Sequence, residues 1–146
     1  MKVSDIMTKD VVIADKNDSI LNVAKLMEHH NIGCIPVVEN GQKVLGVITD
    51  RDIVLNLAKY NFDLENTTAK ELASEVVYKV KPDADARHAL ELMKKVRVRR
   101  LPVMDDEFLV GMLSLGDVAV YGNDEIEVAE ALIEISKPAK VENIDG

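Results

Sequence analysis

The chain has 146 residues, of which 47% are hydrophobic and 30% charged, and its formal net charge is −8. These values fit a globular chain and exclude disordered, fibrous and membrane-spanning classes, since no apolar run approaches the roughly 20 residues of a spanning helix. The acidic balance argues against nucleic acid as a partner, because that binding needs Lys and Arg against phosphates. The opening MKVSDIMTKD lacks the apolar core of a secretory signal, and the single Cys34 permits no internal disulfide. We therefore expect a cytoplasmic protein with no membrane partner.

The first half of the sequence predicts a strand, a helix, a hairpin and a second helix. Residues 11–14 form a short β-type run, and Ser19 opens a stretch whose apolar residues recur at helical spacing. The apolar runs CIPVV and VLGVIT lie on either side of Asn40 and Gly41, a pair that favours a tight hairpin turn. The hairpin leads into a predicted helix over residues 51–59.

The second half repeats this order. Residues 76–80 form the β-type run, RLPVM and FLVGMLS form a hairpin through DDE, and a helix is predicted over residues 115–121. The apolar positions of the intervening helix recur at a shift of 66 residues: Ile20, Val23, Ala24 and Met27 in the first half, and Ala86, Ala89, Leu90 and Met93 in the second.

This repeat predicts an α+β fold in which two β-α-β-β-α units pack through their sheets about an approximate twofold axis. A unit of about 60 residues is marginal alone, so each needs the other. After the second unit, NDEIEVAEALIEIS predicts an amphipathic helix that covers the core or a partner protein, and we favour core cover. The expected organisation is repeat 1 at 1–60, a linker at 61–68, repeat 2 at 69–122, and a C-terminal helix and tail at 123–146.

A short motif ends each hairpin, GVITDRD at residues 46–52 and GMLSLGD at residues 111–117. In a purely structural interpretation, Thr49 with Asp52, and Ser114 with Asp117, form capping boxes at helix starts. In a functional interpretation, the hydroxyl and the helix start bind phosphate while the carboxylate accepts hydrogen bonds from ribose hydroxyls. The motif alone leaves both interpretations open.

The ordered set of segments, present twice, resembles a pair of cystathionine-β-synthase (CBS) domains, the arrangement called a Bateman module. VSDIMTKDVV and AKELASEVV open the two copies, IPVV and RLPVM lie in their hairpins, and the resemblance covers residues 3 to about 121. It implies a regulatory protein that binds an adenosine-containing ligand, such as AMP, ADP, ATP, S-adenosylmethionine or NAD, between the repeats. It further implies a homodimer and a signal passed to an effector protein.

Carried over by position, the resemblance implies that Asp52 and Asp117 hold ribose hydroxyls, and that Thr49 and Ser114 contact ribose or phosphate. The adenine is expected against apolar side chains and strand backbone in both copies, at Val12, Ile13, Ile35, Pro36, Val77, Leu101 and Pro102. Taken without the resemblance, each of these apolar residues is an ordinary core position. Which cleft uses which strand is left open.

The two expected sites differ in charge. The first copy has Gly33 and Cys34 before its Ile-Pro pair, whereas the second has Arg99 and Arg100 before Leu-Pro. Because arginine suits a phosphate through its planar fork of donors, we expect Arg99 or Arg100 to anchor the phosphate tail of one ligand. The alternative is a solvated cationic end of a helix.

The sequence gives little support to a metal site or a catalytic site. His29 and His30 are adjacent, so they point in different directions, and no ligand set with zinc spacing accompanies them. The sequence has no Walker loop and no nucleophile elbow, so we expect no catalysis, no metal and no cofactor beyond the regulatory ligand. An enzyme acting on nucleotides and a scaffold that dimerises without any ligand remain the rival hypotheses.

Overall fold

The computed structural model of the chain describes residues 1–76, 78–123 and 125–138. Within these ranges no helix has the length and apolar character needed to cross a bilayer. The elements in chain order are α1 (Val3–Ile6), β1 (Ala14–Asp15), α2 (Ile20–His30), β2 (Cys34–Glu39), β3 (Lys43–Thr49), α3 (Asp50–Tyr60), α4 (Ala69–Leu72), α5 (Ala86–Val96), β4 (Arg100–Asp105), β5 (Phe108–Ser114), α6 (Leu115–Tyr121) and α7 (Glu125–Ser136).

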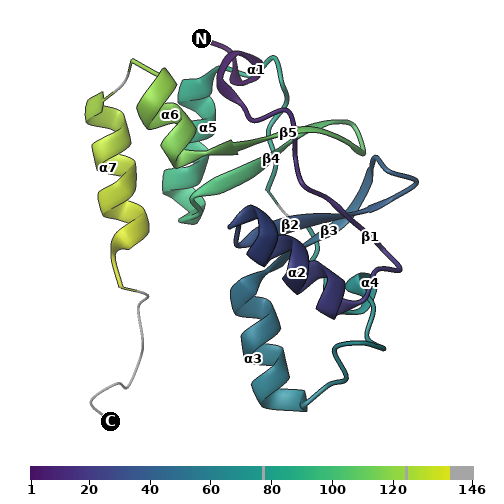
Figure 1. Cartoon of the computed structure of the whole chain (residues 1–146). Coiled ribbons are helices and arrows are strands. Elements are labelled where there is room, and N and C mark those ends of the chain that lie inside the picture. Colours follow the sequence, from purple (N-terminus) through teal and green to yellow (C-terminus); the bar gives the residue numbers. More distant parts are fainter. Residues whose placement is uncertain (77, 124, 139–146) are drawn as a thin grey trace.

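A five-stranded sheet in the order β1-β2-β3-β5-β4 joins the two halves (Figure 1). β2 and β3 form one antiparallel hairpin and β4 and β5 the other, and Lys43 pairs with Phe108 where the hairpins meet beside their turns. Asn40 and Gly41 both have positive φ, as the tight turn requires. The predicted α+β fold of two symmetric repeats is confirmed.

The first strand of each repeat is shorter than its β-type run. Pairing with β2 is confined to Ala14 and Asp15, and in the described part of the second repeat the matching parallel bridge joins Val80 to Val103. The amide of Val11 instead donates to the carbonyl of Lys9 in a local turn.

The segments that lead into the two repeats cross over. Helix α1 packs on the core of the second repeat, whereas α4 packs on the core of the first. The amides and carbonyls of Thr8 and Met112 exchange two hydrogen bonds, of 2.8 and 3.0 Å. Ser74 and Val47 do the same at 2.9 Å each, so the crossing obeys the internal symmetry. We call these segments the leaders: the leader of the first repeat contains α1 and Thr8, and that of the second contains α4 and Ser74. Each repeat is therefore completed by the leader of the other.

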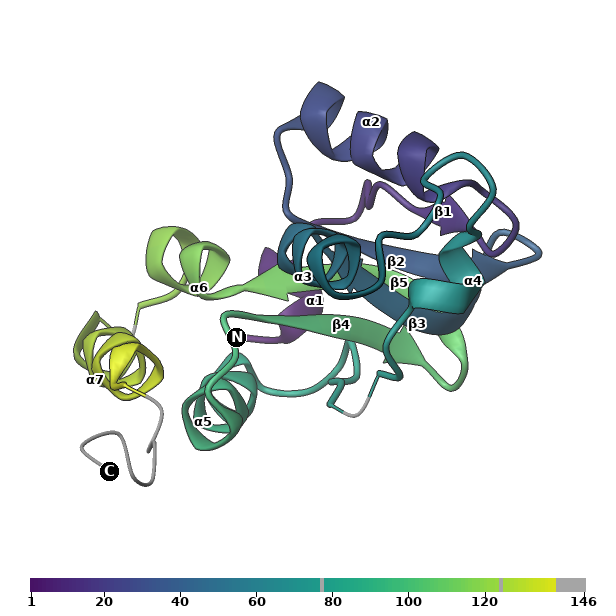
Figure 2. The same ribbon diagram turned by 90° about the horizontal axis from the view of Figure 1, so that it is seen from below.

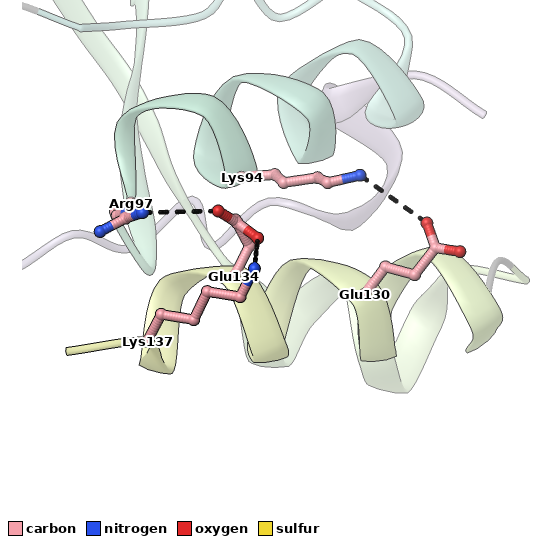
Figure 3. Close-up of polar contacts among 5 residues, drawn as sticks. All are labelled: Lys94, Arg97, Glu130, Glu134 and Lys137. Atoms are coloured by element: carbon pink, nitrogen blue, oxygen red, sulfur yellow. Dashed lines mark hydrogen bonds and ion pairs between the residues drawn. The ribbon is translucent and has the colours of Figure 1, made fainter.

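Helix α7 lies against α5 and α6, apart from α2 and α3 (Figures 1 and 2). Ala131 is fully buried in the second core, which matches the expected covering role. Figure 3 shows the polar side of this contact, where Lys94 faces Glu130 and Arg97 faces Glu134, at 3.8 and 3.5 Å. Lys94 and Arg97, two cations at the C-terminal end of α5, are thus paired with acidic side chains of α7.

Candidate functional site

Both strand-to-helix junctions are capping boxes. The Thr49 hydroxyl accepts from the Asp52 amide at 3.1 Å, while Asp52 Oδ2 accepts from the Thr49 amide at 3.0 Å. Ser114 and Asp117 make the same pair of bonds, each 2.9 Å long. The structural interpretation of the repeated motif therefore holds at both sites.

Capping leaves each carboxylate with an unused oxygen. Both bonds to the N-cap amides end on Oδ2, and a carboxylate carries two oxygens with about four acceptor positions. Within the described ranges no hydrogen bond reaches Oδ1 of Asp52 or Asp117. A ribose hydroxyl can therefore be accepted without loss of the cap, so the two interpretations of the motif are compatible.

The glycine of the motif has a separate cause. A Cβ at Gly46 would lie 2.5 Å from the carbonyl oxygen of Ser74, and one at Gly111 would lie 2.9 Å from that of Thr8. These carbonyls belong to the crossing leaders, which approach the strands at both glycines. The repeated motif thus combines space for the other repeat's leader with a capped helix start three residues later.

The first cleft, of about 310 Å³, lies between the repeats. Its lining combines Ser114 and Asp117 of the second repeat with Val12 and Ile32 of the first repeat. The remaining lining residues are Thr8, Asp10, Val11, Asn31, Gly33, Cys34, Arg100, Met112 and Leu113.

The second cleft, of about 340 Å³, is the counterpart of the first across the internal symmetry. Here Thr49 of the first repeat shares the lining with Tyr78 and Val98 of the second, and these two match Val12 and Ile32 at a shift of 66 residues. The remaining lining residues are Cys34, Val47, Glu75, Val76, Arg100, Leu101, Pro102 and Met112. Each cleft therefore takes its capping hydroxyl from one repeat and most of its apolar lining from the other.

Cys34 and Arg100 lie where the two clefts meet, because both side chains line both clefts. They begin the equivalent strands β2 and β4, and their partners across the hairpins are Thr49 and Ser114. Burial raises the pKa of the Cys34 thiol, and the neighbouring guanidinium of Arg100 opposes that rise. Arg100 also borders a third hollow beside Thr49 and Arg51.

The structure places the other candidate residues unequally. Leu101 and Pro102 line the second cleft, whereas Ile35 is fully buried in the first core. Ile13, Pro36 and Arg99 are absent from the linings of both clefts in the described chain, and so is Asp52, which nevertheless lies near enough to Cys34 to influence that thiol. The expected contact of Val77 lies outside the described residues.

Sequence reasoning missed several wall residues, among them Tyr78, Val98 and Ile32. Ile32 and Val98 are equivalent positions just after α2 and α5, so the 66-residue shift is a signal that marks them as a pair. Among the described residues, no three His, Cys, Asp or Glu side chains are grouped to hold a metal ion.

Comparisons with known proteins place these features in context. A family model described as CBS domain matches the chain twice, at residues 3–59 and 69–124. The CBS domain-containing protein YhcV of Bacillus subtilis (strain 168) is 37% identical over 134 residues, which cover 92% of this chain and 94% of that protein.

Two solved structures are similar over most of the chain. Hypoxic Response Protein I with two coordinated zinc ions has a TM-score of 0.75 and 31% identity, covering 83% of this chain and 98% of that one. The CBS domain pair of protein MJ0100, in complex with 5′-methylthioadenosine and S-adenosyl-L-methionine, has a TM-score of 0.70 and 32% identity. That match covers 82% of this chain and 93% of the other.

Proposed function

Because this chain belongs to the CBS domain family, we propose that it is a regulatory module, without catalysis of its own, that binds an adenosine-containing ligand between its repeats. The ligand classes are AMP, ADP, ATP, S-adenosylmethionine and NAD. Occupancy is signalled to an effector protein by a change of conformation.

The observation that carries this proposal is the composition of the two clefts. Each has most of its apolar lining from one repeat and a capping hydroxyl from the other, as Val12 with Ser114 and Tyr78 with Thr49 illustrate. An apolar wall accommodates a purine, and a nearby carboxylate such as Asp117 accepts hydrogen bonds from ribose. The adenosyl ligands named for the MJ0100 domain pair support the same ligand class here.

The way the clefts are built suggests how occupancy is transmitted. A ligand in either cleft touches both repeats, so it favours whichever relative orientation of the repeats suits it best. The crossing leaders at Thr8 and Ser74 tie each repeat to the other, which makes a small rotation between them the expected response.

The proposed module is a homodimer. Helices α3 and α6, which follow the two motifs, expose Val54, Tyr60, Val120 and Tyr121, each more than 60% accessible. Large apolar side chains gathered on the helices after the motifs are typical of a surface that a partner covers. A second copy of the chain is the partner proposed here.

A melting screen tests ligand binding. At a hundredfold excess over its dissociation constant, a ligand that binds only the folded state adds about 2.7 kcal/mol, or roughly 5 to 10 °C for a chain of this size. Guanosine nucleotides of equal charge serve as controls for the adenine. A chain that responds to no adenosine compound would be a ligand-free dimerisation scaffold instead, and steady conversion of a bound nucleotide would make it an enzyme.

Asp52→Ala and Asp117→Ala test the ribose contacts, each compared with the corresponding Asp→Asn variant. Asparagine keeps an oxygen for the N-cap amide, so this comparison separates loss of the cap from loss of the ligand contact. If the melting shifts survive both alanine variants, the proposed ribose contacts are wrong.

A further inference from the structure

Arg100 occupies a singular position between the two clefts. It opens β4, pairs with Ser114 across the hairpin and lines both clefts, whereas the equivalent residue of the first repeat is the uncharged Cys34. The internal symmetry is therefore broken at the point where the clefts meet. The two equivalent positions together carry one cation, whereas two arginines would be present if the first repeat matched the second there.

The other charged side chains of the two linings make that single cation more important for binding an anion. Among the described residues that line the two clefts, Arg100 is the only Lys or Arg, while Asp10, Asp117 and Glu75 bring negative charge. Without Arg100 every charged side chain in the two described linings would be acidic. Arg99, its neighbour in the chain, belongs to neither lining.

We propose that Arg100 is the phosphate-binding cation of both clefts, so that one side chain sets the affinity of two sites for anionic ligands. This inference rests on the proposed function. Its guanidinium has five donors in a planar fork, which suits the oxygens of a phosphate. The adenosine part of a ligand depends on the apolar walls and the capping residues, which differ between the clefts, so neutral ligands do not need Arg100.

The test compares AMP with neutral 5′-methylthioadenosine by calorimetric titration of the full chain and of Arg100→Gln. Loss of charged hydrogen bonds lowers AMP affinity roughly tenfold to a hundredfold, whereas 5′-methylthioadenosine affinity stays within about twofold. Arg99→Gln is the matched control, because it removes the same charge one residue away and leaves AMP affinity unchanged. An equal loss for both ligands in Arg100→Gln overturns the inference.

A pair of equivalent substitutions resolves the two clefts. Ile32→Trp fills the first cleft and Val98→Trp fills the second, so each variant leaves one cleft open. Adding Arg100→Gln to either background is expected to lower AMP affinity. A loss in only one background makes Arg100 a residue of a single cleft and overturns the inference, while the proposed function stands. Wild-type protein that binds none of these adenosine compounds refutes both.

Cys34 gives a second measurement that needs no tryptophan variant. It is the single cysteine of the chain and lines both clefts, so alkylation of its thiol reports on either one. AMP is expected to slow this alkylation in wild type and in Arg99→Gln. At the same concentration it should not slow the alkylation of Arg100→Gln. Equal protection of all three proteins contradicts the inference.

Discussion

The carbonyl oxygen of Ser74 lies against Gly46 so closely that a Cβ on the glycine would come within 2.5 Å of it. Ser74 belongs to the leader of the second repeat and Gly46 to β3 of the first. Their hydrogen-bonded pairing through Val47 therefore depends on a residue without a side chain. A Cβ on the equivalent Gly111 would lie nearest to the flexible Met7 side chain, and 2.9 Å from the carbonyl oxygen of Thr8.

Gly46→Ala is expected to destabilise the fold by roughly 2 to 3 kcal/mol, because backbone must shift to admit the methyl group. Gly111→Ala should cost less, since the Met7 sulfur can move aside and the backbone carbonyl of Thr8 is met at 2.9 Å, whereas that of Ser74 is met at 2.5 Å. Urea unfolding measures both free energies. Gly116→Ala is the control: its Cβ would meet nothing nearer than 3.6 Å, and removal of a helical glycine should raise stability by roughly 0.5 kcal/mol. Equal effects at 46 and 111 would contradict the difference in neighbours.

The sequence predicted the repeat because its signals are local. Helical spacing at Ile20 and Val23, the turn at Asn40, and the capping pairs each lie within a few residues. The crossing leaders were not predicted, since a contact between Thr8 and Met112 leaves no periodic trace in either segment. Helices α1 and α4 have four residues each, which is too short for a helical period to be recognised.

The candidate site was predicted in its capping residues but not in its assembly. Thr49 and Ser114 were found as a repeated motif, yet most of the apolar side chains that line the cleft with each come from the other repeat. That exchange depends on a contact between distant segments, which local sequence patterns do not predict. The meeting of Cys34 and Arg100 at both clefts has the same origin.

Thr49→Ala and Ser114→Ala are each expected to lower stability by about 1 kcal/mol, because a helix start loses the acceptor for an orphan amide. Thr49→Ser and Ser114→Thr keep the hydroxyl and serve as controls. Urea denaturation measures the free energy of unfolding of each variant, with its dependence on urea concentration expected to stay the same. An alanine variant as stable as its hydroxyl control would show that the cap contributes nothing in solution.

The Cys34 thiol should react slowly with iodoacetamide at pH 8, since burial raises its pKa and the thiolate is the nucleophile. Arg100→Gln removes a cation that lowers this pKa, so the pH profile of alkylation should move to higher pH. Asp52→Asn removes a negative charge that raises the pKa of Cys34, so the pH profile of alkylation in this variant should move to lower pH. Mass spectrometry follows the rates, and shifts in the same direction for both variants would contradict this electrostatic account.

Ala131→Asp should release α7 and destabilise the second repeat by several kcal/mol, because the new carboxylate would be buried without a partner. Ala129→Asp places the same group on an exposed position of the same helix and is the matched control. Glu134→Gln, which removes the partner of Arg97, should change stability by less than about 1 kcal/mol, since exposed ion pairs are weak. Thermal unfolding compares the three variants, and an Ala131→Asp variant as stable as its control would contradict the packing of α7.

The exposed apolar residues of α3 and α6 lead to a prediction about assembly. Val54 and Val120 are 63% and 72% accessible in the single chain, although each is large and apolar. If a second copy covers them, Val54→Asp with Val120→Asp should convert a dimer into a monomer, because two carboxylates would have to be desolvated at the contact. Light scattering on the purified chain gives the mass directly. Ile133→Asp is the control, since it adds the same charge at an exposed apolar residue of α7, and it should leave the dimer intact. A wild-type monomer, or dissociation by the α7 control alone, would place the partner surface elsewhere.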